Sequence, residues 1–111
     1  MTLLKSLGGL ALSVSLVSSA FAGEITVNSD HSDPVPKKAM EELIADFQKA
    51  NPDVKVKWNN FDHEGYKSAI RNFLTADAPD VVAWYAGNRM EPFVKAGLFE
   101  DVTDLWTANG L

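Results

Sequence analysis

The chain has 111 residues, of which 46% are hydrophobic and 23% charged, a balance typical of one folded domain and not of a disordered segment. Its net charge of −5 argues against nucleic acid as a partner, because proteins that bind phosphates present a basic surface. The sequence has no cysteine, which excludes disulfides, thiol nucleophiles and thiolate metal sites.

Residues 1–22 have the pattern of a secretory signal peptide. Lys5 precedes an apolar run from Leu7 to Val17, and Ala20-Phe21-Ala22 has the small residues of a cleavage site. The run is interrupted by glycine and serine and is shorter than the roughly 20 apolar residues of a membrane span. We therefore expect export to the periplasm, cleavage after Ala22 and no stable membrane insertion after the signal is removed.

The following segments alternate between strand and helix patterns. Glu24–Asn28 is a short β-branched run and predicts the first strand. Residues 36–50 place apolar side chains at helical spacing, and Asn51-Pro52 ends this helix because a residue before proline is disfavoured in the α region. Val54–Asn60 alternates apolar and polar residues, which predicts a strand at the edge of a sheet.

A second helix and an apolar run follow. Asp62 is placed to cap the helix, and Tyr66, Ile70 and Leu74 fall on one of its faces. The run Asp80–Tyr85 is apolar enough to be covered on both faces, so we predict that it forms the central strand of the sheet.

A third helix is predicted after Gly87, with Asn88 as its cap and Gly97 ending it in a left-handed turn. Its inward-facing residues are expected to be Met90, Phe93 and Val94. A last helical turn is expected at Val102, Leu105 and Trp106.

This alternation predicts an α/β fold, with a parallel sheet, right-handed crossovers and helices on both faces. Ligands of such sheets bind beyond the carboxyl ends of the strands. Trp84 and Tyr85 offer flat apolar faces there, Asn88 an amide and Arg89 a planar cation, which suit sugar rings and hydroxyls. Core aromatics, a helix cap and an ion pair are the competing interpretations of these residues. Since adjacent strand residues point to opposite faces, at most one aromatic ring is expected to stack on a sugar.

Five segments occur in a characteristic order: Glu24–Val27, Phe47–Val56, Tyr66–Ile70, Ala78–Val82 and Ala96–Trp106. Together they resemble the extracellular solute-binding proteins of ABC importers, in the carbohydrate-binding family that includes maltose-binding protein. The resemblance implies a two-lobed protein that clamps a sugar between its lobes, uses no cofactor and delivers to a membrane permease. Residues 23–111 would be part of the amino-terminal lobe of a longer protein.

The same resemblance places ligand-binding loops after each predicted strand. The residues implied are Asp30 and His31, then Asn60 and Asp62, then Trp84, Tyr85, Asn88 and Arg89.

Two other functions stay open at this point, a small secreted enzyme of flavodoxin-like fold and a self-associating interaction protein. The residue types of a hydrolytic triad occur in His31-Ser32-Asp33, and those of a metal site occur in Asp62-His63-Glu64. Consecutive residues point in different directions, however, so neither run favours catalysis. Self-association would bury the exposed sheet edge.

Overall fold

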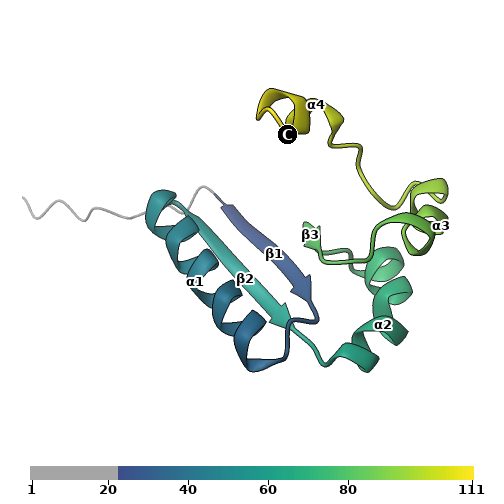
Figure 1. Ribbon diagram of the computed structural model, residues 1–111, viewed down its shortest axis with the longest axis horizontal. Coiled ribbons are helices and arrows are strands. Elements are labelled where there is room, and N and C mark those ends of the chain that lie inside the picture. The colour runs from purple at the N-terminus through teal and green to yellow at the C-terminus, as the bar shows by residue number, and fades with distance from the viewer. Residues whose placement is uncertain (1–22) are drawn as a thin grey trace, which may run out of the picture.

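The computed structural model describes residues 23–111, so the predicted signal peptide lies outside the described residues. Strands and helices alternate along these residues, as predicted (Figure 1). The elements are β1 (Gly23–Ser29), α1 (Pro34–Ala50), β2 (Val54–Asn60), α2 (His63–Ala76), β3 (Val81–Val82), the 3-10 helix η1 (Gly87–Arg89), α3 (Glu91–Lys95) and α4 (Thr103–Ala108).

The three strands form a parallel sheet in the order β2-β1-β3. β1 pairs with β2 over its whole length, from Gly23 opposite Val54 to Ser29 opposite Asn60. The parallel α/β fold and the edge position of β2 are thus confirmed. The prediction of a central strand at Asp80–Tyr85 is wrong, because β1 is central and β3 is a two-residue strand at the other edge.

Two side-chain effects keep β3 short. The Oδ2 of Asp80 accepts a hydrogen bond from the Thr26 amide at 2.7 Å, where a longer β3 would offer a backbone carbonyl. Pro79 has no N–H to give to a ladder. Val81 lies on the α1 side of the sheet, and Val82 packs against the core formed with α2. The run Asp80–Tyr85 therefore has apolar residues on both faces even though β3 is an edge strand.

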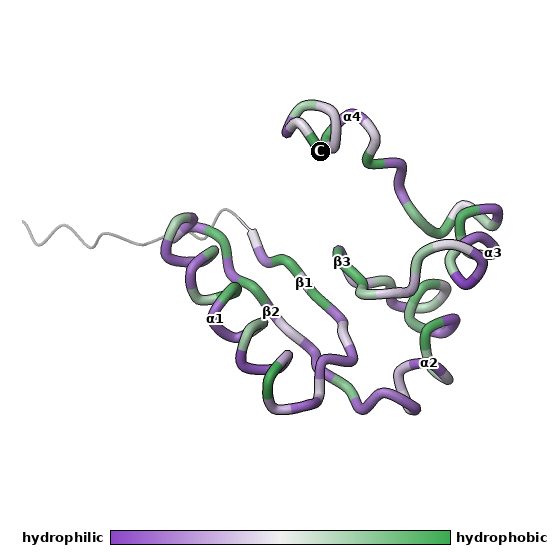
Figure 2. Tube along the Cα trace, in the orientation of Figure 1, coloured by the Kyte–Doolittle hydropathy of each residue, from purple (hydrophilic) through white to green (hydrophobic). Residues whose placement is uncertain are grey.

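Helix α1 covers one face of the sheet. Figure 2 shows hydrophobic stretches on β1 and β2, and on α1 in alternation with hydrophilic ones. An open apolar groove separates this helix from the sheet, and Leu43, Phe47 and Val81 are exposed along it. The residues that line the groove are Met40, Leu43, Ile44 and Phe47 of α1 and Ile25, Val27, Val56 and Val81 of the sheet. Asn51 ends the helix as predicted, since its backbone N–H and its side-chain amide both donate to the Phe47 carbonyl at 2.9 Å.

Helix α2 lies on the other side of the sheet, where its Tyr66 hydroxyl bonds to the Asn28 carbonyl of β1, and α3 packs against α2. Asp62 caps α2 by accepting from the Gly65 amide at 2.8 Å, which confirms the predicted start of that helix. The buried core consists of Tyr66, Ile70 and Leu74 of α2 and Phe93 of α3. The half-buried side chains packed against it are Phe61, Phe73, Val82, Trp84, Leu98 and Phe99.

The region after β3 differs in part from the prediction. Asn88 lies inside η1 and does not cap α3. The reason is a separate 3-10 turn that starts at Gly87, whose φ is +73°. The Met90 amide closes this turn by donating to the Gly87 carbonyl at 2.9 Å. Only Phe93 of the three expected residues is buried, since a helix as short as α3 presents one side chain to the core; Met90 and Val94 are exposed. Gly97 ends α3 with φ +70°, as predicted.

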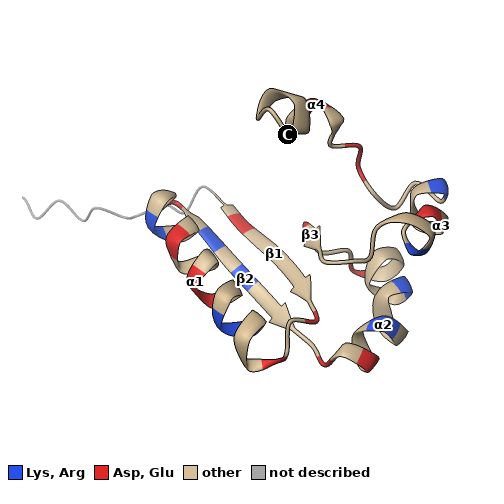
Figure 3. Cartoon of the chain, in the orientation of Figure 1, with Lys and Arg blue, Asp and Glu red and all other residues tan. Residues whose placement is uncertain are grey.

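Helix α4 forms the predicted last helical turn and lies apart from the sheet (Figure 1). Its apolar residues Leu105 and Trp106 are exposed. Figure 3 shows Lys and Arg interleaved with acidic residues on α1, α2 and α3, whereas β2 carries only basic ones among its charged residues. Over residues 23–111, none of the helices combines the length and the apolar character that crossing a membrane requires.

Candidate functional site

A cleft of about 380 Å³ opens at the carboxyl edge of the sheet, where β1 and β3 end. Parallel strands bring their following loops to the same edge, which is where ligands of α/β sheets bind. The residues that line the cleft are Asp30 and His31 after β1, and Val82, Ala83, Trp84 and Tyr85 at the end of β3.

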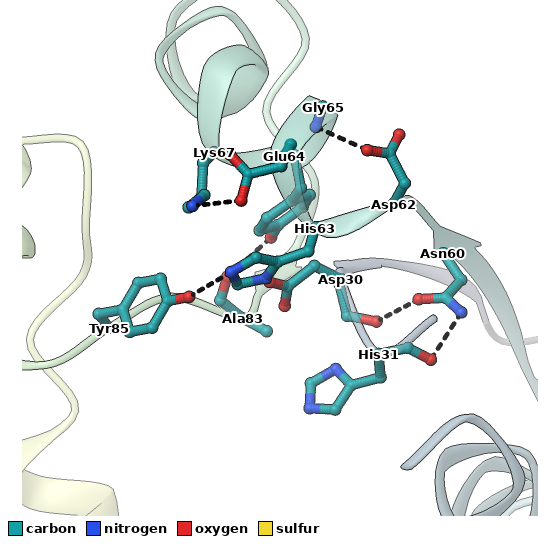
Figure 4. Close-up of polar contacts among 12 residues, drawn as sticks. Asp30, His31, Asn60, Asp62, His63, Glu64, Gly65, Lys67, Ala83 and Tyr85 are labelled. Carbon is teal, nitrogen blue, oxygen red and sulfur yellow. Dashed lines mark hydrogen bonds and ion pairs between the residues drawn. The ribbon is translucent and has the colours of Figure 1, made fainter. Parts of the chain in front are cut away.

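The loop after β1 is held in place by β2. Ser29 is fully buried, and its Oγ accepts from Trp58 Nε1 at 2.8 Å and donates to Asn60 Oδ1 at 3.2 Å. The Nδ2 of Asn60 then donates to the His31 carbonyl at 2.9 Å (Figure 4). Asn60 therefore positions the His31 loop from behind and does not line the cleft.

Two polar atoms at the cleft have no partner within residues 23–111. The Nδ1 of His31 is buried and makes no hydrogen bond there. Asp30 uses only Oδ2 for its contact with His63, which leaves Oδ1 as a free acceptor among the described residues. Buried polar atoms are normally paired, so His31 Nδ1 is an unmet hydrogen-bonding group beside the cleft. Asp30 Oδ1 is an acceptor that a bound molecule or water can use.

A chain of polar contacts joins the two walls of the cleft through His63, the first residue of α2 (Figure 4). Its Nδ1 lies 2.6 Å from Asp30 Oδ2, and its Nε2 lies 3.2 Å from the Tyr85 hydroxyl. The two aromatic rings meet edge to face, with centroids 6.3 Å apart. Asp30 and Tyr85, which are far apart in sequence, are thus connected by one imidazole.

Trp84 and Tyr85 take different roles although both line the cleft. Trp84 packs on the core rings of Tyr66 and Phe93, and its Nε1 donates to the Arg89 carbonyl at 3.0 Å. Tyr85 is 36% exposed, and the guanidinium of Arg89 lies 4.5 Å from its ring centroid. The two rings reach the same cleft because residues 83–86 are not in a strand, so opposite-facing alternation does not apply.

Tyr66 supports the cleft from below. Its hydroxyl lies 3.0 Å from the Asn28 carbonyl and 2.8 Å from the Ala83 carbonyl, so it ties α2 to β1 and to the segment after β3. Burial raises the pKa of this hydroxyl well above its usual range, and the nearby Asp30 carboxylate raises it further. The group is therefore a neutral donor that fixes the backbone of the cleft wall.

The remaining predicted residues lie outside the cleft. Asp62 is the exposed cap of α2, and Asn88 is exposed on η1. Arg89 contacts two cleft-lining residues, the Tyr85 ring through its guanidinium and Trp84 Nε1 through its carbonyl, but does not line the cleft itself. Nowhere in the part of the chain that the structure describes do three His, Asp or Glu side chains gather as a candidate metal site.

His63 and Tyr66 are structurally important residues of the site that sequence reasoning did not select. The sequence carries a signal for Tyr66, which lies on the apolar face of α2 but has a hydroxyl that burial must satisfy. The only signal for His63 is its position beside a helix cap that follows a strand, and that position does not identify Asp30 as its partner.

Comparison with protein families gives a match to bacterial extracellular solute-binding protein over residues 31–111. Among solved structures, the bacterial solute receptor AcbH is similar, with a TM-score of 0.71 and 31% identity over 80% of this chain. That receptor is described as having an exclusive substrate preference for β-D-galactopyranose. The chain spans 22% of the receptor's length. No match is found among curated protein sequences.

Proposed function

Because this chain belongs to the bacterial extracellular solute-binding protein family, we propose that it contributes to sugar capture as part of the substrate-binding component of an ABC importer. Membership of this family makes it a binding protein and not an enzyme. The proposed ligand site is the cleft at the carboxyl edge of the sheet, between the loop after β1 and the segment after β3.

The observation that carries this proposal is the composition of the cleft. It combines aromatic surface from Trp84 and Tyr85 with two hydrogen-bonding atoms that have no partner in residues 23–111, His31 Nδ1 and Asp30 Oδ1. A sugar presents apolar C–H faces and hydroxyls that both donate and accept, so it matches both kinds of surface. The similarity to AcbH, with its galactopyranose preference, supports a monosaccharide as the ligand class.

We further propose that the opposite wall of the cleft belongs to a second lobe of a longer receptor, because the chain aligns with a small share of the AcbH chain. One wall leaves the far side of a sugar in water and its hydroxyls partly unpaired, so the chain alone should bind weakly. Export through residues 1–22 to the periplasm and delivery to a membrane permease complete the proposed function.

The proposal is tested by titrating the ¹⁵N-labelled chain with β-D-galactose and with a panel of other monosaccharides, since amide NMR shifts detect millimolar binding. We expect saturable shifts at Asp30, His31 and Tyr85, and their loss in Tyr85→Ala. Trp106→Ala is the matched control, because this exposed aromatic residue lies on α4, away from the cleft. Shifts that are absent for every sugar, or that persist in Tyr85→Ala, would contradict a sugar site here.

A further inference from the structure

We infer that His63 is a positioning residue of the proposed sugar site, and that its protonation state decides whether the Tyr85 hydroxyl donates or accepts in the cleft. The inference rests on the proposed function for its ligand, but the geometry behind it lies entirely within the chain. His63 does not itself line the cleft, whereas both of its partners, Asp30 and Tyr85, do.

Asp30 determines which imidazole nitrogen carries the proton. An ionised carboxylate only accepts hydrogen bonds, so the short contact from Asp30 Oδ2 to His63 Nδ1, at 2.6 Å, requires the proton on Nδ1. In the neutral ring Nε2 is then an acceptor. The Tyr85 hydroxyl, 3.2 Å from Nε2, must therefore donate its single proton to His63.

This arrangement gives the Tyr85 oxygen a defined polarity toward a ligand. With its proton directed at His63, the oxygen offers only lone pairs to the cleft and accepts from a sugar hydroxyl. When His63 gains a second proton, both ring nitrogens become donors. The Tyr85 oxygen then accepts from Nε2–H, and its own proton is free to donate to the ligand.

The charged and titratable groups around His63 come from the loop after β1, the first turn of α2, the segment after β3 and η1. Asp30 and His31 follow β1, Asp62 and Glu64 flank His63 along the chain, and Tyr85 follows β3. Two cations also belong to this surface. Lys67 pairs with Glu64 at 2.7 Å and holds the pKa of that carboxyl below its usual range, and Arg89 covers the Tyr85 ring.

The first test needs no ligand. The chain has two histidines, so the imidazole nitrogen signals in a ¹⁵N–¹H spectrum that vanish in His63→Gln belong to His63. At pH 8 we expect these signals to show the Nδ1–H tautomer in the wild type and in Tyr85→Phe, and a mixture of tautomers in Asp30→Asn. A predominant Nε2–H tautomer in the wild type would overturn the inference.

The second test uses fluorinated galactoses, each with one hydroxyl replaced by fluorine, which accepts a hydrogen bond but cannot donate one. Titrations at pH 5.5 and pH 8 cover the range in which histidine side chains ordinarily change charge. At pH 8 the Tyr85 oxygen accepts from one sugar hydroxyl, so the analogue with fluorine at that position should bind more weakly than galactose. This loss of affinity should be about threefold to tenfold larger at pH 8 than at pH 5.5. His63→Gln should abolish this difference between the two pH values.

The outcomes separate this inference from the proposed function. If galactose and the other sugars fail to bind the wild type, the sugar-binding proposal fails, while the tautomer spectrum still decides the role of Asp30 and His63. If galactose binds but no analogue shows a pH-dependent loss, or if His63→Gln keeps that dependence, the inference about His63 is overturned and the sugar site stands.

Discussion

The Tyr66 hydroxyl links three segments under the cleft, and its removal tests whether that link stabilises the fold. In Tyr66→Phe the Asn28 carbonyl keeps a second donor, the Ala83 amide at 2.9 Å, but the Ala83 carbonyl loses its only hydrogen bond among residues 23–111. One lost hydrogen bond with an unpaired, partly buried acceptor costs about 1–2 kcal/mol. The apolar packing of the ring is unchanged.

Urea unfolding followed by far-UV circular dichroism measures this cost, and a thermal scan should show a decrease in Tm of about 4–8 °C per kcal/mol. Tyr85→Phe is the matched control, because its hydroxyl is at the surface and its removal should change the free energy of unfolding by less than about 0.5 kcal/mol. Equal destabilisation in the two variants would refute the structural role assigned to Tyr66.

The raised pKa of Tyr66 adds a dependence on pH. The unfolded chain releases this proton near pH 10, whereas the folded chain still holds it, so the stabilisation is complete below about pH 10 and declines as pH rises above it. The slope is at most about 1.4 kcal/mol per pH unit. The stability difference between wild type and Tyr66→Phe should therefore narrow between pH 10 and pH 11, as measured by urea unfolding at each pH.

Three further predictions concern helix ends and processing. Asp62→Ala should cost about 1 kcal/mol in urea unfolding because it removes the side-chain cap of α2, whereas Asp33→Ala should cost much less, since Asp33 precedes α1 without a side-chain cap bond. Gly97→Ala should cost about 1–2 kcal/mol at φ +70°, and Gly97→Asn less, because asparagine tolerates the left-handed region; equal costs would contradict a backbone origin. Mass spectrometry of the exported protein should find Gly23 as its first residue, and retention of Met1 would contradict cleavage after Ala22.

Local patterns in the sequence were sufficient for the elements whose ends depend on neighbouring residues. The stop of α1 at Asn51, the cap of α2 at Asp62 and the end of α3 at Gly97 were predicted, because capping and left-handed turns involve groups a few residues apart. The order of strand and helix also predicted which loops share one edge of the sheet, and therefore the position of the cleft.

Contacts between distant segments were decided only by the tertiary structure. The apolar run Asp80–Tyr85 has the same composition whether it is central or at an edge, and the hydrogen bond from Thr26 to Asp80, 54 residues apart, helps to end its pairing early. The partnership of His63 with Asp30 and Tyr85 likewise depends on how the first turn of α2 lies between two loops. The hydrophobic periodicity of a sequence predicts which face of a helix or strand is buried. It does not predict which polar group from a distant segment contacts that helix or strand.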